Sequence, residues 1–228
     1  MTRAALAALL AVAVVAACGG GEQHGKAALW VTRDRGADVL IVRTVDAGQT
    51  ALQALDRVAD VETRYGGRFV QAIDGVAGSL SDQRDWFYFV NGIEGDRSAA
   101  EYRLHPGDVL WWDYRSWAET MRAPVVVGAF PEPFLHGYDG KRREACVLYE
   151  LPRLRRAAEA IARRIRARAT SAVCTPGANV LEVTFVRTPF HAESGGPDRP
   201  VTFRISGADA LRLAENPRLA RFHYAGLG

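Results

Sequence analysis

The run from Trp86 to Val90, followed at once by Asn91-Gly92, constrains the fold more than any other stretch of this sequence. Aromatic and β-branched residues in such a run favour a β-strand. Asn-Gly is the strongest short signal for a tight hairpin turn. Alternate side chains of a strand point to opposite faces, so Trp86 and Tyr88 share one face and the two Phe side chains share the other. Both faces are apolar, and we expect a helix to cover one and the second half of the chain to cover the other.

The segments around this strand predict a small mixed sheet with one helix. The expected helix is capped by Thr50, which forms a capping box with Gln53, and ends near Ala59. The expected strands are residues 28–33, 39–42, 69–73, 86–90 and 109–114. One helix against a small sheet that begins with a hairpin predicts an α+β, β-grasp-like domain over residues 28–117.

Residues 118–228 predict a second small α/β domain. Apolar residues recur at helical spacing from Leu151 to Arg168, so we expect an Arg-rich amphipathic helix there, with Pro152 in its first turn. A shorter helix is expected to follow Ser206 and to end before Pro217. The expected strands are residues 125–127, 146–149, 180–186 and 201–205. A chain of 228 residues with 48% hydrophobic residues is long enough for two such domains.

The N-terminus has the layout of a bacterial lipoprotein signal peptide. Arg3 precedes a short apolar run that ends in Val15-Ala16-Ala17-Cys18. The run is shorter than the roughly 20 apolar residues of a membrane-spanning helix. We expect residues 1–17 to be removed, Cys18 to carry the lipid (palmitate) and residues 18–27 to form a flexible tether. The protein would then be anchored to the extracytoplasmic face of the cell membrane. The alternative is an ordinary secretory signal with an incidental Cys.

Two further cysteines, Cys146 and Cys174, remain once Cys18 is assigned to the lipid. Outside the cytoplasm such thiols usually pair, so we expect a disulfide with Cα atoms within about 7 Å. Such a bridge stabilises a fold by roughly 3 kcal/mol. Two buried free thiols are the alternative. A zinc site is disfavoured because neither Cys has a CxxC or HxxxH partner.

Four segments of the first half resemble the C-terminal domain of the transcobalamin and intrinsic-factor family, which also occurs in bacterial envelope proteins. They are residues 48–55 (GQTALQAL), 69–75 (FVQAIDG), 86–92 (WFYFVNG) and 106–114 (PGDVLWWDY). The resemblance implies the fold, an extracytoplasmic setting and a binding role without catalysis. In the animal family this domain closes over a corrinoid held by a large α-helical domain, which this chain lacks. The resemblance still implies cobalamin as a possible ligand and a nutrient transporter as a possible partner.

The candidate ligand site consists of the aromatic side chains on these strands. The rings of Trp86, Tyr88, Trp112 and Tyr114 could stack on a flat, partly apolar ligand, and Asn91 and Asp113 could supply polar contacts. The alternative is that the second domain covers the aromatic side chains and that Asn91 serves the turn.

The sequence lacks the common catalytic and nucleotide-binding motifs. Its five His residues are scattered, and HExxH, GxSxG and P-loop patterns are absent, so we predict no catalytic or metal-binding residues. The Arg-rich segment from Lys141 to Arg168 could meet anionic lipid headgroups or form a solvated face, whereas export argues against nucleic acid. A binding or accessory protein is the expected function. The alternative is an extracytoplasmic hydrolase with a site between the two domains.

Overall fold

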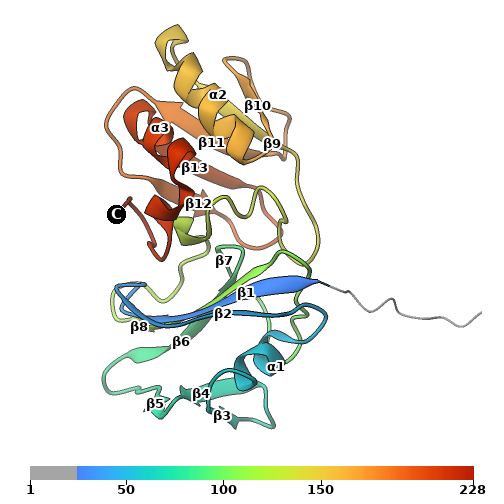
Figure 1. Ribbon diagram of the computed structural model, residues 1–228. Coiled ribbons are helices and arrows are strands. Elements are labelled where there is room, and N and C mark those ends of the chain that lie inside the picture. Colours follow the sequence, from blue (N-terminus) through green and yellow to red (C-terminus); the bar gives the residue numbers. More distant parts are fainter. Residues whose placement is uncertain (1–24) are drawn as a thin grey trace, which may run out of the picture.

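The structure, a computed structural model, describes residues 25–228. It contains two lobes, and Figure 1 shows the lobe formed by the first half of the chain below the lobe formed by the second half. The predicted signal peptide, Cys18 and most of the predicted tether lie outside the described residues. Within residues 25–228, no helix is both long and apolar enough to cross a membrane. The fold is a mixture of helices and sheets in which sheets dominate, in agreement with an α+β chain at that level.

A five-stranded mixed sheet forms the centre of the first lobe. Its order is β2-β1-β8-β6-β7, and β1 is parallel to β8 while the other neighbours are antiparallel. The strands are β1 (Lys26–Arg33), β2 (Asp38–Asp46), β6 (Arg84–Val90), β7 (Ile93–Glu94) and β8 (Val109–Ser116). Lys26 and Ala27, expected in the tether, already belong to β1 because they pair with Asp46 and Val45 of β2.

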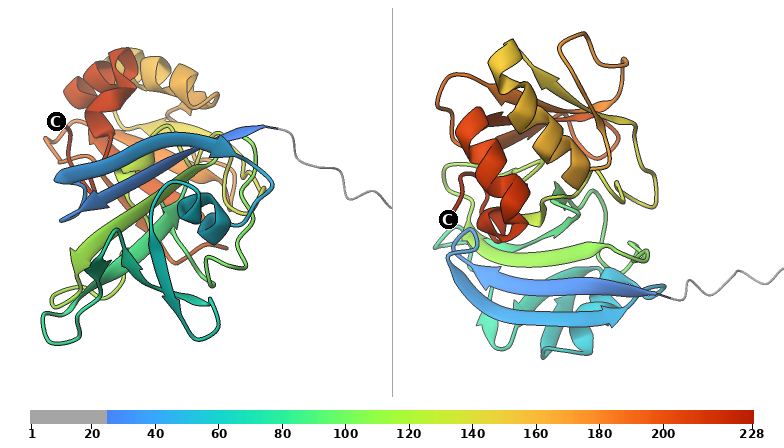
Figure 2. Two further views of the ribbon diagram at one scale, coloured as in Figure 1. Left: turned by 60° about the horizontal axis from the view of Figure 1, so that its bottom comes forward. Right: turned by 45° about the horizontal axis from the view of Figure 1, so that its top comes forward.

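One helix and a second, smaller sheet cover one face of this central sheet (Figure 2). They are α1 (Ala51–Asp56) and the antiparallel strands β3 (Val61–Arg64), β4 (Phe69–Ile73) and β5 (Val76–Ala77). The predicted capping box of Thr50 and Gln53 is present. The helix ends at Asp56, three residues before the predicted Ala59, because Val58 N–H donates to Leu55 O and tightens the last turn.

The Asn91-Gly92 turn joins β6 and β7 as predicted. Its φ angles are 54° and 78°, the left-handed pair that a two-residue hairpin loop requires. Gly92 is required for a second reason, since a Cβ there would lie 2.6 Å from the Val126 carbonyl oxygen. The turn therefore both reverses the chain and lies against the start of the second half.

The second lobe has a five-stranded sheet in the order β10-β9-β11-β13-β12, in which β12 alone is antiparallel to its neighbour. The strands are β9 (Ala145–Tyr149), β10 (Arg168–Thr170), β11 (Asn179–Thr184), β12 (His191–Ser194) and β13 (Val201–Ser206). The helices α2 (Arg155–Arg164) and α3 (Gly207–Glu215) lie side by side over one face (Figure 1). The 3₁₀ turns are η1 (Val127–Ala129), η2 (Pro152–Leu154) and η3 (Pro217–Ala220).

Two predictions for the second half were wrong in detail. Residues 125–127 do not form a strand, since Val125 makes a single bridge to Ile93 and Val127 begins η1. The predicted helix up to Arg168 ends at Arg164, because Arg166 has a left-handed φ of 51° and the chain enters β10 at Arg168. Parallel pairing of β10 with β9 forces this early reversal.

The second face of the first sheet packs against the second lobe, as predicted. We call this surface the closed face; it consists of Trp30, Phe89 and Trp111 of the sheet with Val126, Phe222 and Tyr224 of the second half. The Trp30 and Phe222 rings are 4.9 Å apart and the Phe89 and Tyr224 rings 5.4 Å apart. Gly36 permits this approach, because a Cβ there would lie 1.7 Å from the Phe222 carbonyl oxygen.

The predicted disulfide between Cys146 and Cys174 is present. The two Cα atoms are 6.1 Å apart, inside the predicted limit, and the bridge closes a span of 28 residues. It connects β9 to the segment between β10 and β11, so it holds this side of the second sheet together.

Candidate functional site

An apolar groove of about 680 Å³ runs along the outer edge of β6, and we call it the edge groove. Aromatic side chains provide much of its surface, with a few charged groups among them. Its lining includes Phe69, Asp85, Trp86, Phe87, Tyr88, Trp112, Trp117 and Met121. Concave, largely apolar surfaces with few polar groups are typical of small-molecule sites.

The groove exists because β7 is too short to cover β6. It pairs with Phe89 and Val90 alone, which leaves the earlier part of β6 without a neighbour on that side. Asn91 N–H donates to Val109 O, so by alternation Trp86 and Tyr88 direct their backbone groups away from β8. Gly95 N–H donates to Tyr88 O and Trp86 N–H donates to the Asp85 carboxylate. The Trp86 C=O and the Tyr88 N–H therefore face the outer edge of β6.

The wall on one side of the groove is the segment that follows β8. Buried Arg115 fixes this segment by donating to Thr120 O at 2.9 Å and to Met121 O at 3.0 Å. Its guanidinium also lies 3.7 Å from the centre of the Phe87 ring. Trp117 is fixed by its backbone N–H, which donates to Gln83 O. The wall is therefore hydrogen-bonded to β8 through Arg115 and to Gln83, the residue that precedes β6.

Three of the four predicted aromatic residues line the groove, namely Trp86, Tyr88 and Trp112. Tyr114 stands outside the lining. The rings stack on one another rather than standing free, with Trp86 5.2 Å from Tyr114 and Tyr88 5.2 Å from Trp112.

The polar atoms of these rings are mostly satisfied by backbone carbonyls. Trp86 Nε1 donates to Val76 O at 2.7 Å, and Tyr88 Oη donates to Arg97 O at 2.7 Å. Burial raises the pKa of Tyr88, so its hydroxyl stays protonated at neutral pH. The Trp112 indole N–H is buried and has no hydrogen-bond partner in the part of the chain that the structure describes.

Asn91 lies at the junction of the two lobes and not in the groove. Its amide donates to Asp108 Oδ1 at 2.7 Å and to Gly137 O at 2.8 Å, while its Oδ1 accepts from Val109 N–H. All of these partners are protein groups, which fits the alternative that Asn91 serves the turn.

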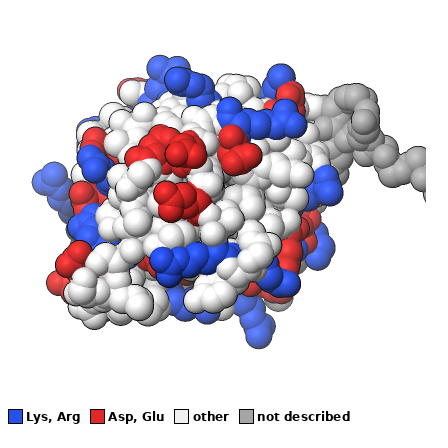
Figure 3. Space-filling model, turned by 90° about the horizontal axis from the view of Figure 1, so that it is seen from below, with Lys and Arg blue, Asp and Glu red and all other residues white. Residues whose placement is uncertain are grey.

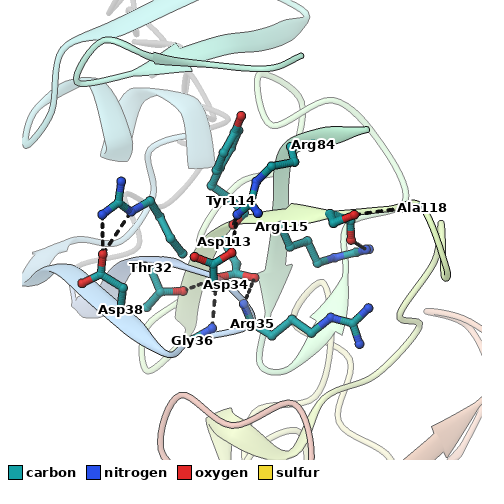
Figure 4. A network of polar contacts seen from close by, with 12 residues as sticks. Thr32, Asp34, Arg35, Gly36, Asp38, Arg84, Asp113, Tyr114, Arg115 and Ala118 are labelled. Atoms are coloured by element: carbon teal, nitrogen blue, oxygen red, sulfur yellow. Dashed lines mark hydrogen bonds and ion pairs between the residues drawn. The ribbon is translucent and has the colours of Figure 1, made fainter. Parts of the chain in front are cut away.

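Asp113 is also remote from the groove, on the closed face. Its carboxylate accepts from Thr32 Oγ1 at 2.6 Å and from the Gly36 N–H at 3.1 Å in the β1–β2 turn (Figure 4). It accepts further from the Arg35 N–H and from Tyr224 Oη at 2.9 Å. Four donors fix the buried carboxylate, so Asp113 is a structural junction between three distant segments.

Sequence reasoning missed Asp85 and Trp117, two residues of the groove lining. Asp85 directly precedes the aromatic strand, and Trp117 lies three residues after the end of the strand predicted at residues 109–114. Their positions beside two strongly predicted strands were the signals from which these two residues could have been found. The pairing of β6 with β8, which brings residues 85 and 115 opposite each other, was not visible in the sequence.

Two buried carboxylates and two histidines meet near the junction of the lobes. Glu132 accepts from the His136 backbone N–H at 2.9 Å and lies 2.6 Å from His136 Nδ1. Asp108 accepts from the His105 N–H at 2.8 Å. Burial raises the pKa of both Glu132 and Asp108. This cluster is where the alternative prediction of a hydrolase would place its site.

Charges on the surface are mixed. Viewed from below, acidic side chains gather near the centre of the face and basic ones lie farther out (Figure 3). Several residues of the Arg-rich segment are bound locally: Arg155 pairs with Glu159, and Arg164 donates to the Ala214 and Glu215 carbonyls. Between residues 25 and 228, no group of three or more His, Cys, Asp or Glu side chains is arranged to hold a metal ion.

Comparisons with known proteins concern the first lobe. Residues 48–116 match a family described as a domain of unknown function, DUF4430. No curated protein matches the chain. A candidate metal-binding protein from Ruminococcus gnavus is 19% identical with a TM-score of 0.34, and the match covers 40% of this chain and 97% of that one.

Haptocorrin in complex with Cbi is 16% identical with a TM-score of 0.35. The match covers 41% of this chain and 25% of the haptocorrin chain, so it spans a quarter of that protein.

Proposed function

We propose that this protein is a lipid-anchored, extracytoplasmic binding protein that holds a flat, partly apolar small molecule in the edge groove. The observation that carries the proposal is the groove of about 680 Å³, lined by Trp86, Tyr88 and Trp112. Its mouth adds exposed apolar side chains, since Leu80 and Met121 are 85% and 55% exposed. Burying such surface under a ligand is favourable by roughly 25 cal/mol per Å².

The disulfide supports an extracytoplasmic location, because disulfides persist in oxidising compartments. The lipid anchor rests on Val15-Ala16-Ala17-Cys18. Mass spectrometry of the membrane fraction tests it: the mature N-terminus is expected to be a lipid-modified Cys18. An unmodified thiol or cleavage at another bond contradicts the anchor.

The first lobe is proposed to be a β-grasp domain of the transcobalamin-like type. Two features support this: α1 follows the β1–β2 hairpin, and the last strand β8 lies parallel to β1 in the middle of the sheet. A corrinoid is therefore the first ligand to test, and a transporter encoded by a neighbouring gene is the partner to look for.

Tryptophan fluorescence provides the test of binding, since three tryptophans line the groove. Titration of the protein with cobalamin, other tetrapyrroles and smaller aromatic compounds is expected to change the emission beyond the inner-filter effect. Trp117→Ala is expected to weaken that response. If no flat apolar compound changes the emission at tens of micromolar, the proposal of small-molecule binding in the groove fails.

A hydrolase with its site near Glu132 is the second candidate. The observation that favours it is the contact of buried Glu132 with His136, since a carboxylate beside a histidine can orient a general base. The interlobe groove of about 220 Å³ beside Glu132 could admit a small substrate. Hydrolysis of chromogenic esters that disappears in Glu132→Gln and in His136→Ala would support this candidate. Equal activity in the variants and the unaltered protein contradicts it.

A further inference from the structure

The charges in the edge groove are balanced except at one residue. Four charged side chains line the groove: Arg68, Asp85, Glu94 and Arg97. Arg68 pairs with Glu101, Arg97 pairs with Asp96, and Glu94 lies 3.6 Å from both Arg115 and Arg122. Asp85 has no cationic partner among the residues that the structure places.

The cross-strand neighbour of Asp85 explains this isolation. Arg115 lies directly opposite on β8, but its guanidinium turns to Glu94 and to the carbonyl oxygens of the 120–121 segment. The Asp85 carboxylate instead accepts a single hydrogen bond, from the Trp86 backbone N–H at 2.8 Å. Oδ2 has no protein donor within residues 25–228.

The surroundings of Asp85 keep it partly out of water. Its carboxylate lies close to Gly78, where an added Cβ would be 2.5 Å from Oδ1. Burial raises the pKa of the Asp85 carboxyl, and the Trp86 N–H opposes this by a smaller amount. A cation bound beside the carboxylate would favour its ionised form, so the group gains most from a positively charged ligand.

The rest of the groove suits the same kind of ligand. The faces of aromatic rings attract ammonium groups, and Trp86 and Trp117 are both in the lining. The Trp86 C=O, which faces the outer edge of β6, can accept a hydrogen bond from an ammonium N–H. Apolar side chains beyond these groups leave room for an uncharged body.

We propose that the edge groove selects small molecules that carry an ammonium group next to an apolar or aromatic body, with Asp85 as the counter-charge. This inference rests on the proposed binding function and specifies its ligand class. The ammonium nitrogen would lie between the Asp85 carboxylate and the Trp86 C=O, while the apolar body packs on Trp86 and Trp117.

Three probes that share a 2-phenylethyl group and differ in their terminal group test the inference by calorimetric titration at neutral pH. They are 2-phenylethylamine, 2-phenylethanol and 3-phenylpropionate. The amine is expected to bind at least tenfold more tightly than the alcohol, and the carboxylate more weakly than either. Asp85→Asn is expected to remove the preference for the amine and to leave binding of the alcohol unchanged. Asp82→Asn, an exposed carboxylate outside the lining, is the matched control and is expected to keep the preference.

The outcomes separate this inference from the proposed function. Equal binding of amine and alcohol, or an amine affinity unchanged in Asp85→Asn, overturns the inference while the groove remains a binding site. If none of the three probes binds at millimolar concentration, the inference fails, and a positive fluorescence titration with larger flat compounds would still support the proposed function. Circular dichroism and thermal unfolding of Asp85→Asn confirm that its fold is intact.

Discussion

Both faces of the β6–β8 strand pair are aromatic, but only one of them is completely covered. On the closed face, Phe89 and Trp111 are completely buried under the second lobe. On the other face, Trp86 and Tyr88 are covered by α1 and the β3–β5 sheet but border the edge groove. The two faces differ in how far their covering elements extend. The second lobe extends across the closed face, whereas the β3–β5 sheet does not reach the outer edge of β6.

This comparison teaches that aromatic content alone does not identify a binding surface. The closed face has a polar network in which Trp111 Nε1 donates to Thr32 Oγ1, which in turn donates to Asp113. Each side also keeps one buried indole N–H without a partner among residues 25–228, that of Trp30 on the closed face and that of Trp112 on the groove side. The groove side differs by the Asp85 carboxylate, which accepts one hydrogen bond and has no ion pair within these residues. A carboxylate without a charged partner beside open apolar surface is therefore what distinguishes the groove from the closed face.

Trp111→Ala tests the closed face most severely. A large buried ring is lost, and Thr32 Oγ1 loses the hydrogen bond that it accepts from Trp111 Nε1. The free energy of unfolding is therefore expected to fall by about 3–5 kcal/mol. Urea denaturation followed by far-UV circular dichroism measures the loss. A change below about 1 kcal/mol would contradict the view that this face holds the lobes together.

Removal of the disulfide tests whether the closed face couples the two lobes. Replacing Cys146 and Cys174 together by Ser is expected to reduce stability by about 3 kcal/mol, because the unfolded chain regains the freedom of a long loop. If the lobes are coupled, tryptophan fluorescence of the first lobe and circular dichroism are expected to show one common unfolding transition at lower denaturant concentration. Two separated transitions would contradict coupling through the closed face.

Tyr224→Phe tests the polar junction on the closed face and its dependence on pH. Burial, and then the nearby Asp113 carboxylate, raise the pKa of Tyr224 well above its ordinary value of 10. The folded state therefore holds the phenolic proton at pH values where the unfolded chain releases it. Stability from this group is complete below pH 10 and is lost as the pH rises through the raised pKa.

At neutral pH the Phe variant is expected to lose about 1 kcal/mol, the value of one hydrogen bond. Above pH 10 the stability of the variant is expected to fall less steeply than that of the unaltered protein. The two slopes are expected to differ by about 1.4 kcal/mol per pH unit. Denaturation curves between pH 8 and about pH 11 check both numbers, with Tyr65→Phe as the exposed control. Parallel pH profiles for Tyr224→Phe and the unaltered protein would contradict the assignment.

Trp117→Ala is expected to have the smallest effect on stability. The residue is half-buried at the wall of the groove, so the loss is expected to be about 1 kcal/mol or less, while binding of apolar ligands in the groove weakens markedly. Thermal unfolding and ligand titration of the same sample give both values. A stability loss as large as that of Trp111→Ala would erase the distinction between the two faces.

The sequence predicted the elements of the first lobe well where local signals were strong. The Asn91-Gly92 turn, the Thr50 capping box and the aromatic strand all formed as expected. Short strands such as β5 and β10 were missed, because two or three residues carry no periodicity of their own and depend on a neighbouring strand. The helix that ends at Arg164 was predicted too long, because the pairing of β10 with β9 overrode the apolar pattern of the sequence.

The candidate site was predicted in part. Alternation correctly put Trp86, Tyr88, Trp112 and Tyr114 on one face, but could not show that their rings stack on each other. Asn91 and Asp113 were assigned as polar contacts from their proximity in sequence, and the structure places them at junctions between distant segments. Asp85 stands out only when the pairing of every other charge in the groove is known.

The contact between Asp113 and Tyr224 joins residues 111 positions apart, and this separation bears on how the chain reaches its fold. At a synthesis rate of 5–20 residues per second, about 6–22 s pass between the two residues. Through that interval the closed face lacks the cover of Phe222 and Tyr224, which makes it a surface for premature self-association. Newly made chains are therefore expected to depend on a holding chaperone, and variants shortened before residue 222 to accumulate as aggregates.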